Sequence, residues 1–372
     1  MKSFLLLTLW LPLVVYAQKK TPKMYDLLVG GYGSSISVYR FYPETGKLAY
    51  LSESDSIKNP SYLCVDKDSR FVYAVSEKDS DSEVMAYSLA PKTGQLTFVN
   101  KQPVKGAAAC YISIDEDRKN IFVANYLSGS ISVLPLKEDG SVLPPSQLIQ
   151  GKGRSVNKER QEAPHAHTAF LSPDEKYLLY TDLGTDKIHS YRYKDGQQQP
   201  LIPVSVTNVK PGSGPRHLDF SPDKKHVYVV QELTGEVVVF DYDDGKLKEV
   251  QTVSMLAPGF KGVVGAADIH VSADGKYVYA SNRGDVNNIV VYAIAPETGL
   301  LTFVERKPTM GKAPRNFVID PTGNFILVAN QDSNSIFVFR RDKASGQIRE
   351  IASYVQVNKP TCLKFAAAQT PK

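Results

Sequence analysis

Cysteine is scarce in this chain, and the short motifs of the common hydrolases and nucleotide-binding enzymes are missing. Cys64, Cys110 and Cys362 are an odd number for a disulfide framework, and each stands inside an apolar run, so we expect three buried free thiols. No G-x-S-x-G, H-E-x-x-H, Walker or dinucleotide fingerprint occurs in the sequence. These absences remove the common serine hydrolases and the nucleotide-dependent enzymes from the leading interpretations.

A concentrated run of one charge is also absent. The chain has 44 Lys and Arg residues against 39 Asp and Glu residues, and its formal net charge of +5 is small for 372 residues. Nucleic-acid-binding proteins usually gather their basic residues on one face, whereas the lysines here are scattered. We therefore expect no nucleic-acid partner.

The longest apolar run stands at the N-terminus. Lys2 precedes an apolar stretch over residues 4–15, and the small residues Val15 and Ala17 end it. This pattern predicts a secretory signal over residues 1–17. An uncleaved anchor is disfavoured because spanning a bilayer takes about 20 apolar residues. We expect an exported protein, periplasmic or secreted, that has no membrane association once the signal is cleaved.

A turn flanked by two short apolar runs recurs through the rest of the chain, as in HLDFSPDKKHVYVV. The copies are anchored at Asp66, Asp115, Ser172, Ser221, Ser272 and Asp320. Each copy continues into a third alternating run and, in most cases, through a tight turn into a more polar fourth. Four antiparallel strands in a unit of about 50 residues are typical of a β-propeller blade.

The two ends of the chain supply a seventh unit. Residues 359–365, KPTCLKF, match the first strand of a blade, and the remaining three strands stand near the N-terminus as YDLLVGG, SISVYRF and KLAYLSE. The sequence therefore predicts an all-β fold, a seven-bladed β-propeller closed by a split blade from both termini. Closing the ring removes the exposed sheet edges. We expect residues 18–372 to form this single domain.

The polar ends of the inner strands predict a site at one mouth of the central channel. The start of the first strand and the end of the second share the face opposite the recurring turn. At that mouth stand His167, Arg216, Glu232, Arg283 and Arg315. Several arginines around one cavity repel each other unless an anion compensates them, so the pattern favours an anionic ligand. Two long loops, residues 151–164 and 257–265, lead into the same face, which is typical of a functional site.

Further candidates and alternatives come from the same positions. The substrate-binding candidates beside the central group are His165, His217, Asp268, Arg315 and Asn316. An inter-blade ion-pair ladder is the structural alternative for Arg216, Glu232 and Arg283. His165 and His167 form an H-x-H on one strand face, but no third metal ligand of matching spacing is apparent, and we expect no metal.

With these residues in view, the chain resembles the seven-bladed lactonase family of bacterial 6-phosphogluconolactonases and fungal carboxy-muconate lactonizing enzymes. The segments that carry the resemblance are GSGPRHLDFSPDKKHVYVVQE, GAADIHVSADGKYVYASNRG and KAPRNFVIDPTGNFILVANQDSNSIFVF. The resemblance covers nearly all of residues 18–372 and implies a cofactor-free lactone site. His167 matches the family's histidine, Arg216 and Arg283 match its two arginines, and Glu232 matches its glutamate.

The resemblance implies a lactone hydrolase that opens a sugar-acid lactone, phosphorylated or plain, to the free acid. His167 would act as the base, and one of Arg216 and Arg283 would stabilise the oxyanion. The other arginine, with Arg315, would hold an anionic group of the substrate. The division of roles among the two arginines and Glu232 stays open. We expect a small anionic sugar lactone as the substrate, and a monomer or weak homo-oligomer.

Two other classes of function remain as alternatives. A non-catalytic exported propeller could bind a glycan or a protein, and would not need a histidine and two arginines at these positions. A metal-dependent sugar lactonase of the gluconolactonase type would need carboxylate and amide ligands, which Asp182, Asn282 and Asn330 could supply. The bacterial phosphogluconolactonases of the resembled family act in the cytosol, so an export signal leaves the phosphorylated substrate open.

Overall fold

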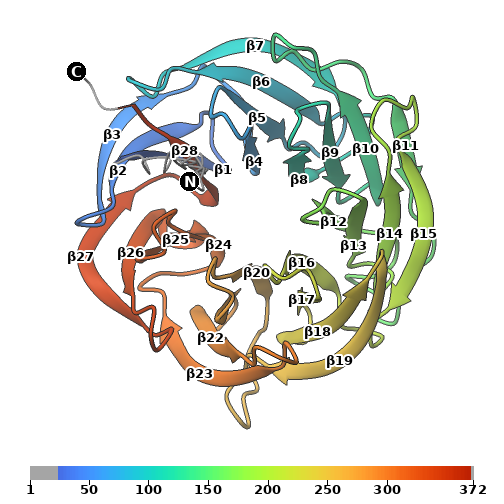
Figure 1. Cartoon of the computed structure of the whole chain (residues 1–372), viewed down its shortest axis with the longest axis vertical. Helices are drawn as coiled ribbons and strands as arrows, with labels where there is room; N and C mark the ends of the chain where they lie inside the picture. The colour runs from blue at the N-terminus through green and yellow to red at the C-terminus, as the bar shows by residue number, and fades with distance from the viewer. Residues whose placement is uncertain (1–23, 370–372) are drawn as a thin grey trace, which may run out of the picture.

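The strands of the molecule form seven four-stranded antiparallel sheets arranged as the blades of a ring (Figure 1). The structure is a computed structural model that describes residues 24–369. The secretory signal predicted over residues 1–17 lies outside the described residues. Within the described range, no helix is long and apolar enough to cross a membrane.

Six blades follow one another along the chain, and each begins with the strand nearest the axis (Figure 1). These innermost strands are β4 (Leu63–Val65), β8 (Ala109–Ile114), β12 (Ala166–Leu171), β16 (Pro215–Phe220), β20 (Ala266–Val271) and β24 (Pro314–Ile319). The second strands are β5 (Phe71–Ser76), β9 (Asn120–Asn125), β13 (Tyr177–Asp182), β17 (His226–Gln231), β21 (Tyr277–Asn282) and β25 (Phe325–Asn330).

The outer half of each blade is a second hairpin. The third strands are β6 (Glu83–Leu89), β10 (Ser130–Pro135), β14 (Lys187–Tyr193), β18 (Glu236–Asp243), β22 (Asn288–Ile294) and β26 (Ser335–Arg341). The outermost strands are β7 (Leu96–Pro103), β11 (Gln147–Gln150), β15 (Leu201–Asn208), β19 (Lys246–Ser254), β23 (Leu301–Pro308) and β27 (Ile348–Gln356). A short 3-10 helix, η1 (Gln331–Ser333), follows β25.

The seventh blade joins the two ends of the chain, as the sequence predicts. Its innermost strand is β28 (Pro360–Ala367), which pairs antiparallel with β1 (Tyr25–Gly31). The blade continues through β2 (Ser37–Tyr42) to β3 (Lys47–Glu53). The predicted all-β, seven-bladed propeller with a split closing blade is therefore confirmed.

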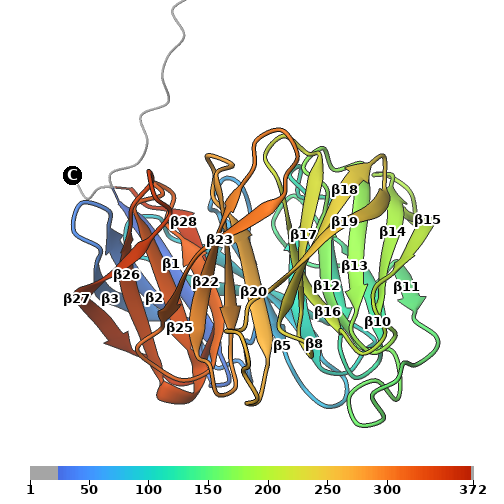
Figure 2. The same cartoon turned by 90° about the horizontal axis from the view of Figure 1, so that it is seen from below.

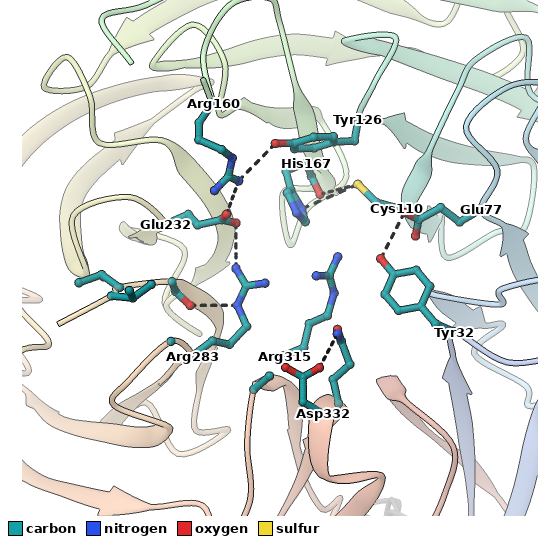
Figure 3. Close-up of a pocket in the computed structure, with 16 residues that line it drawn as sticks. Tyr32, Glu77, Cys110, Tyr126, Arg160, His167, Glu232, Arg283, Arg315 and Asp332 are labelled. Carbon is teal, nitrogen blue, oxygen red and sulfur yellow. Dashed lines mark hydrogen bonds and ion pairs between the residues drawn. The ribbon is translucent and has the colours of Figure 1, made fainter. Parts of the chain in front are cut away.

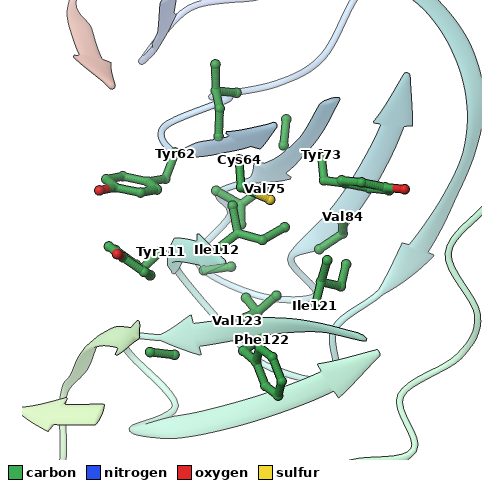
Figure 4. Close-up of a cluster of buried hydrophobic side chains, with 14 of the residues drawn as sticks. Tyr62, Cys64, Tyr73, Val75, Val84, Tyr111, Ile112, Ile121, Phe122 and Val123 are labelled. Atoms are coloured by element: carbon green, nitrogen blue, oxygen red, sulfur yellow. The ribbon is translucent and has the colours of Figure 1, made fainter. Parts of the chain in front are cut away.

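The hydrophobic core lies between neighbouring blades. The second strands β9, β13, β17, β21 and β25 are buried along their whole length because both of their faces meet another blade. The outermost strands alternate instead, as β19 and β27 do, because one face meets water. Figure 4 shows one such cluster, where Tyr73 and Val75 lie near Ile121 and Val123 of the next blade.

The three cysteines are buried and free, which confirms the sequence expectation. Cys64 and Cys362 lie in β4 and β28, and Cys110 lies in β8. Burial raises the pKa of the Cys64 thiol above its usual range and that of the Cys362 thiol to about 11. Both side chains remain neutral apolar groups in the core.

A β-bulge marks the channel end of the innermost strands. The pairing register shifts between Ala109 and Tyr111, between Ala166 and Thr168, between Pro215 and Leu218, and between Pro314 and Asn316. A bulge re-aims the side chain of the extra residue. The residues inside these bulges include Cys110, His167, Arg216 and Arg315. Seen from the side, the strands run between two loop-bearing faces of the ring (Figure 2), and the bulges all stand at one of them.

Candidate active site

The face that carries the bulges also holds a cavity of about 460 Å³ (Figure 3). Much of its wall comes from one repeated position, the first residue after the second strand of a blade. Six of the seven blades contribute that residue to the wall, namely Tyr32, Glu77, Tyr126, Glu232, Arg283 and Gln331. The exception is Leu183 after β13, which is buried elsewhere. The cavity is therefore built by the blade repeat itself.

Most of the rest of the wall comes from the bulges and from the two long loops, and Gly284, Ala313 and Asp332 add to it beside the ends of β21, β24 and β25. Cys110, His167 and Arg315 reach the cavity from the innermost strands. Arg160 reaches it from the loop over residues 151–164, and Val263 from the loop over residues 257–265. Strands fix most of the polar groups, whereas Arg160 is held only by a loop.

Glu232 is the centre of an arginine cluster. Its Oε2 accepts from Arg216 Nε at 2.8 Å and pairs with Arg283 Nη2 at 3.1 Å, and its Oε1 accepts from Arg160 Nη2 at 2.6 Å. Burial raises the pKa of Glu232, but Arg283, Arg216 and Arg160 outweigh burial and hold that pKa far below its usual range. Glu232 is therefore an anion that orients arginines, and it is unsuited to donate a proton.

The four arginines around the cavity have different surroundings. Arg216 is only 1% exposed, donates Nη1 to the carbonyl of Ala267, and stands behind Glu232 without lining the cavity. Arg283 lines the cavity and donates Nε to the carbonyl of Gly265 at 3.0 Å. Burial lowers the pKa of Arg283 to about 10, so the guanidinium stays charged at neutral pH.

Arg315 points into the middle of the cavity (Figure 3). Among the described residues, no carboxylate lies within ion-pair distance of its guanidinium, which lies 5.5 Å from the centroid of the Tyr32 ring. Burial lowers its pKa, but Tyr32, Glu77 and Glu232 outweigh burial and the net shift is upward. Arg315 therefore presents a permanent cation to whatever enters the cavity.

His167 presents an unprotonated imidazole to the same space. Burial, followed by the charges of Arg216, His217 and Arg315, holds its pKa well below the usual 6.5. Its Nδ1 lies 3.8 Å from Cys110 Sγ. Burial raises the pKa of that thiol to about 12, so the sulfur stays neutral. A neutral histidine in a cation-lined pocket can accept a proton at its unprotonated nitrogen, and it carries no positive charge that would repel the arginines.

Three of the predicted substrate-binding residues lie together outside the cavity wall. Asp268 Oδ1 pairs with His217 Nδ1 at 2.7 Å, and its Oδ2 accepts from Asn316 Nδ2 at 2.5 Å. His270 Nε2 lies 3.0 Å from the same Oδ2. This buried network ties β16, β20 and β24 together near the axis. His217 contacts the site indirectly, since its ring centroid lies 5.2 Å from that of His167.

His165, the fourth predicted substrate-binding residue, also stands outside the cavity wall. It stacks on Tyr126 with ring centroids 4.4 Å apart, and its Nε2 lies 3.1 Å from Glu162 Oε1. Within residues 24–369, no group of three or more His, Cys, Asp or Glu side chains is placed to hold a metal ion. Asp182, an alternative metal ligand, instead accepts from the backbone amides of His165 and Gly184.

Sequence reasoning brought His167, Glu232, Arg283 and Arg315 to one cavity but missed Tyr32, Glu77, Tyr126 and Arg160. For three of the missed residues, a signal was present in the repeat. Glu77 and Tyr126 occupy the position of Glu232 and Arg283 in their own blades, and Tyr32 occupies it in the split blade. Arg160 has no repeat equivalent because it lies in a loop of one blade only.

Comparison with known proteins agrees with this architecture. The family described as "Lactonase, 7-bladed beta-propeller" matches residues 26–365. The chain is 37% identical to the 6-phosphogluconolactonase of Bacillus subtilis, over 91% of this chain and 97% of that protein. It is 34% identical to the 6-phosphogluconolactonase of Formosa agariphila, over 90% of this chain and 96% of that protein. The solved structure of the periplasmic gluconolactonase PpgL of Pseudomonas aeruginosa superposes on this chain with a TM-score of 0.88. The two are 38% identical in sequence, and the match covers 93% of this chain and 100% of PpgL. The chain therefore belongs to the seven-bladed β-propeller lactonase family, and its enzyme class is that of the lactonases, which hydrolyse a cyclic carboxylic ester.

Proposed function

We propose that this lactonase opens a sugar-acid lactone to the free acid with its own side chains and no cofactor. The observation that carries the proposal is the neutral imidazole of His167 in a cavity that also presents the guanidinium groups of Arg283 and Arg315. A base beside fixed cations is the arrangement that ester hydrolysis requires, because water must lose a proton while negative charge develops on the carbonyl oxygen.

His167 would act as the general base through Nε2. The thiol of Cys110 is directed to the carbonyl of Ala166 at 3.7 Å, which leaves its sulfur free to accept from Nδ1–H of His167. In that tautomer Nε2 carries the lone pair. Water then adds to the lactone carbonyl as its proton passes to Nε2. The tetrahedral intermediate collapses by breaking the bond to the ring oxygen, which takes the proton back and becomes a hydroxyl group.

The position of each arginine in the cluster would decide whether it contacts the substrate or orients another side chain. Arg283 and Arg315 line the cavity, so either can meet the developing oxyanion or an anionic group of the substrate. Arg216 cannot contact a ligand from behind Glu232, and it acts as a positioning residue for that carboxylate. Glu232 in turn fixes Arg283 and Arg160.

The test is lactone hydrolysis by purified protein. The mature protein should hydrolyse glucono-1,5-lactone, its 6-phosphate or both faster than the spontaneous reaction, and a chelator should leave the rate unchanged. A chelator-sensitive rate restored by a divalent cation would contradict the cofactor-free mechanism. No acceleration of either lactone would contradict the proposed function.

Arg283→Lys should lower kcat/KM by roughly tenfold to a hundredfold, because lysine keeps the charge but loses the planar fork that meets Gly265, Glu232 and the ligand at once. Its melting temperature should change little. Arg216→Lys should instead lose mainly stability, since the fully buried side chain would leave Glu232 or the Ala267 carbonyl without its donor. Turnover and thermal unfolding measured on both variants check this contrast. Equal turnover per folded molecule in wild type and Arg283→Lys would favour a purely structural ion-pair cluster.

We also propose that the protein is exported and cleaved after Ala17. The support is the apolar run over residues 4–15, which ends in small residues, together with the periplasmic location in the name of the PpgL relative. N-terminal sequencing of protein recovered from the periplasm or medium should begin at Gln18. A chain that starts at Met1 and fractionates wholly with the cytosol would contradict this prediction.

A further inference from the structure

The imidazole of His167 is held by a weak hydrogen bond. Among the described residues, the partner of the ring is Cys110, whose Sγ lies 3.8 Å from Nδ1 (Figure 3). A thiol sulfur is a weak acceptor, so this contact fixes the ring poorly by itself. Two other rings meet the imidazole edge to face, Tyr126 at 5.6 Å and His217 at 5.2 Å between ring centroids. Packing against these rings therefore decides where Nε2 of His167 points.

The ring of His217, in contrast, is fixed by a strong hydrogen bond. Its Nδ1 lies 2.7 Å from Asp268 Oδ1, and because an ionised carboxylate only accepts hydrogen bonds, Nδ1 carries the proton. Burial lowers the pKa of His217 to about 4, so the ring is neutral at neutral pH. Tyr111 and Tyr62 pack against it at a steep angle, with ring centroids 5.3 and 5.7 Å away. His217 therefore presents a neutral ring of fixed orientation to the imidazole of His167.

Asp268, which holds His217, is itself fixed by the next blade. Its Oδ2 accepts from Asn316 Nδ2 at 2.5 Å and from the backbone amide of Phe317 at 3.2 Å, both in β24. The same oxygen lies 3.0 Å from Nε2 of His270 in β20. Burial raises the pKa of Asp268, but His270 and His217 outweigh burial and keep the carboxyl ionised. The carboxylate is therefore a rigid anchor for the ring of His217.

We propose that His217 is a positioning residue, which Asp268 holds against His167 so that Nε2 of His167 faces the cavity. The proposal deepens the proposed lactonase function and rests on it, because the orientation of this imidazole affects the rate only if it is the base. A small misplacement of a catalytic group can cost a large part of the rate, so side chains that lock its rotamer contribute without touching the substrate. His217 lies outside the cavity wall, which fits such an indirect role.

Two substitutions separate the ring of His217 from its hydrogen bond. His217→Asn keeps a donor for Asp268 but removes the ring, and it should lower kcat by roughly tenfold to a hundredfold while KM changes little. His217→Phe keeps a ring against His167 but loses the donor. Its melting temperature should fall, while its turnover per folded molecule should stay within about threefold of wild type. The measurements are initial-rate kinetics and thermal unfolding of the same preparations.

His226→Asn is the matched control. His226 is a second buried histidine of the same blade, and its Nδ1 lies 3.2 Å from Asp241 Oδ1. It begins β17, at the end of the strand away from the cavity. The control should change stability and keep the wild-type turnover per folded molecule.

Nitrogen NMR of protein labelled at histidine reports the orientation of His167 without turnover. In the wild type and in His217→Phe, the ring of His167 should give one set of signals with the proton on Nδ1, assigned by their loss in His167→Ala. His217→Asn should give a mixture of the two tautomers, because the ring is no longer confined.

An unchanged set of His167 signals in His217→Asn, or wild-type kcat per folded molecule in that variant, would overturn the proposal. A His217→Phe variant as slow as His217→Asn would overturn it too, since the ring would then not be the part of His217 that acts. If no lactone is hydrolysed, the proposed function fails, and the tautomer spectra then decide by themselves whether His217 orients His167.

Discussion

Replacing His167 with alanine is expected to lower kcat by roughly 10²–10⁴-fold while KM changes much less. The imidazole is the one unprotonated nitrogen base among the cavity-lining side chains of the described residues. Its removal should leave Arg283 and Arg315 in place to bind the substrate, because Arg283 is held by Gly265 and Glu232 and Arg315 lies against the Tyr32 ring. The measurement is initial-rate kinetics on the lactone that the wild-type protein hydrolyses best.

His189→Ala is the matched control for this variant. His189 is a second imidazole of the same blade, stacks on Tyr180 with ring centroids 4.3 Å apart, and has a pKa lowered to about 4 by burial and by Lys187. It lies in β14, outside the cavity wall. The control should lose some stability but keep its turnover. Wild-type turnover in His167→Ala would remove His167 from the role of base.

The pH profile gives a second measure of the same group. Burial and the charges of Arg216, His217 and Arg315 depress the pKa of His167, so the active neutral form persists below the usual histidine pKa of 6.5. We expect kcat/KM to stay level as the pH falls from 8 through 6.5, and to decline only in more acidic solution. A decline centred at or above 6.5 would mean that the base is an imidazole in a more exposed place.

Deleting residues 359–372 is expected to abolish cooperative folding of the ring. The deletion removes β28, which pairs with β1 from Tyr25 to Gly31 and buries Cys362 and Leu363 between blades. It also removes the bond from Thr361 Oγ1 to the carbonyl of Ser61 in the neighbouring blade. Since the whole stability of a domain is typically about 5–15 kcal/mol, the loss of a central strand and its core contacts can exceed it. Thermal unfolding followed by circular dichroism, with size-exclusion chromatography, measures the effect.

The control for the truncation is removal of residues 370–372 alone, which keeps β28 whole and should leave the melting temperature unchanged. An intact transition at the wild-type temperature after removal of residues 359–372 would show that the ring does not depend on the C-terminal strand. A small loss of stability would indicate that the blade of β1, β2 and β3 holds together with an open inner edge. Either result would contradict the expected role of the split blade.

The fold could be predicted from the sequence because each blade repeats the same local chemistry. The Ser-Pro-Asp turns fix the first hairpin, as in Ser221, whose Oγ donates to Asp223 and accepts from the amide of His226. The apolar second strands predict burial on both faces of the strand, and HVYVVQ is buried along its whole length. The KPTCLKF segment predicted the closing strand because it matched the first strand of other blades and lacked its partners nearby.

The sequence predicted only those site residues that occupy repeat positions in the blades. Strand direction places the ends of the inner strands at one mouth of the channel. Four residues predicted at those positions line the cavity, namely His167, Glu232, Arg283 and Arg315. His217, Asp268 and Asn316 stand one residue further along their strands, where the bulge turns them into a buried network near the axis. The sequence alone does not show which of two neighbouring residues a bulge will aim at the cavity.

The sequence by itself determined the ring, its seven-fold repeat, the closing strand and the mouth at which the polar residues gather, since these follow from periodicity and strand direction. Only the tertiary structure decided which charges meet. Packing of separate blades places Arg160, Arg216 and Arg283 on Glu232, leaves Arg315 without a carboxylate partner among the described residues, and leaves one oxygen of Glu77 without a donor there. Contacts between blades depend on side-chain reach across the central channel, and no local pattern in the chain encodes that distance.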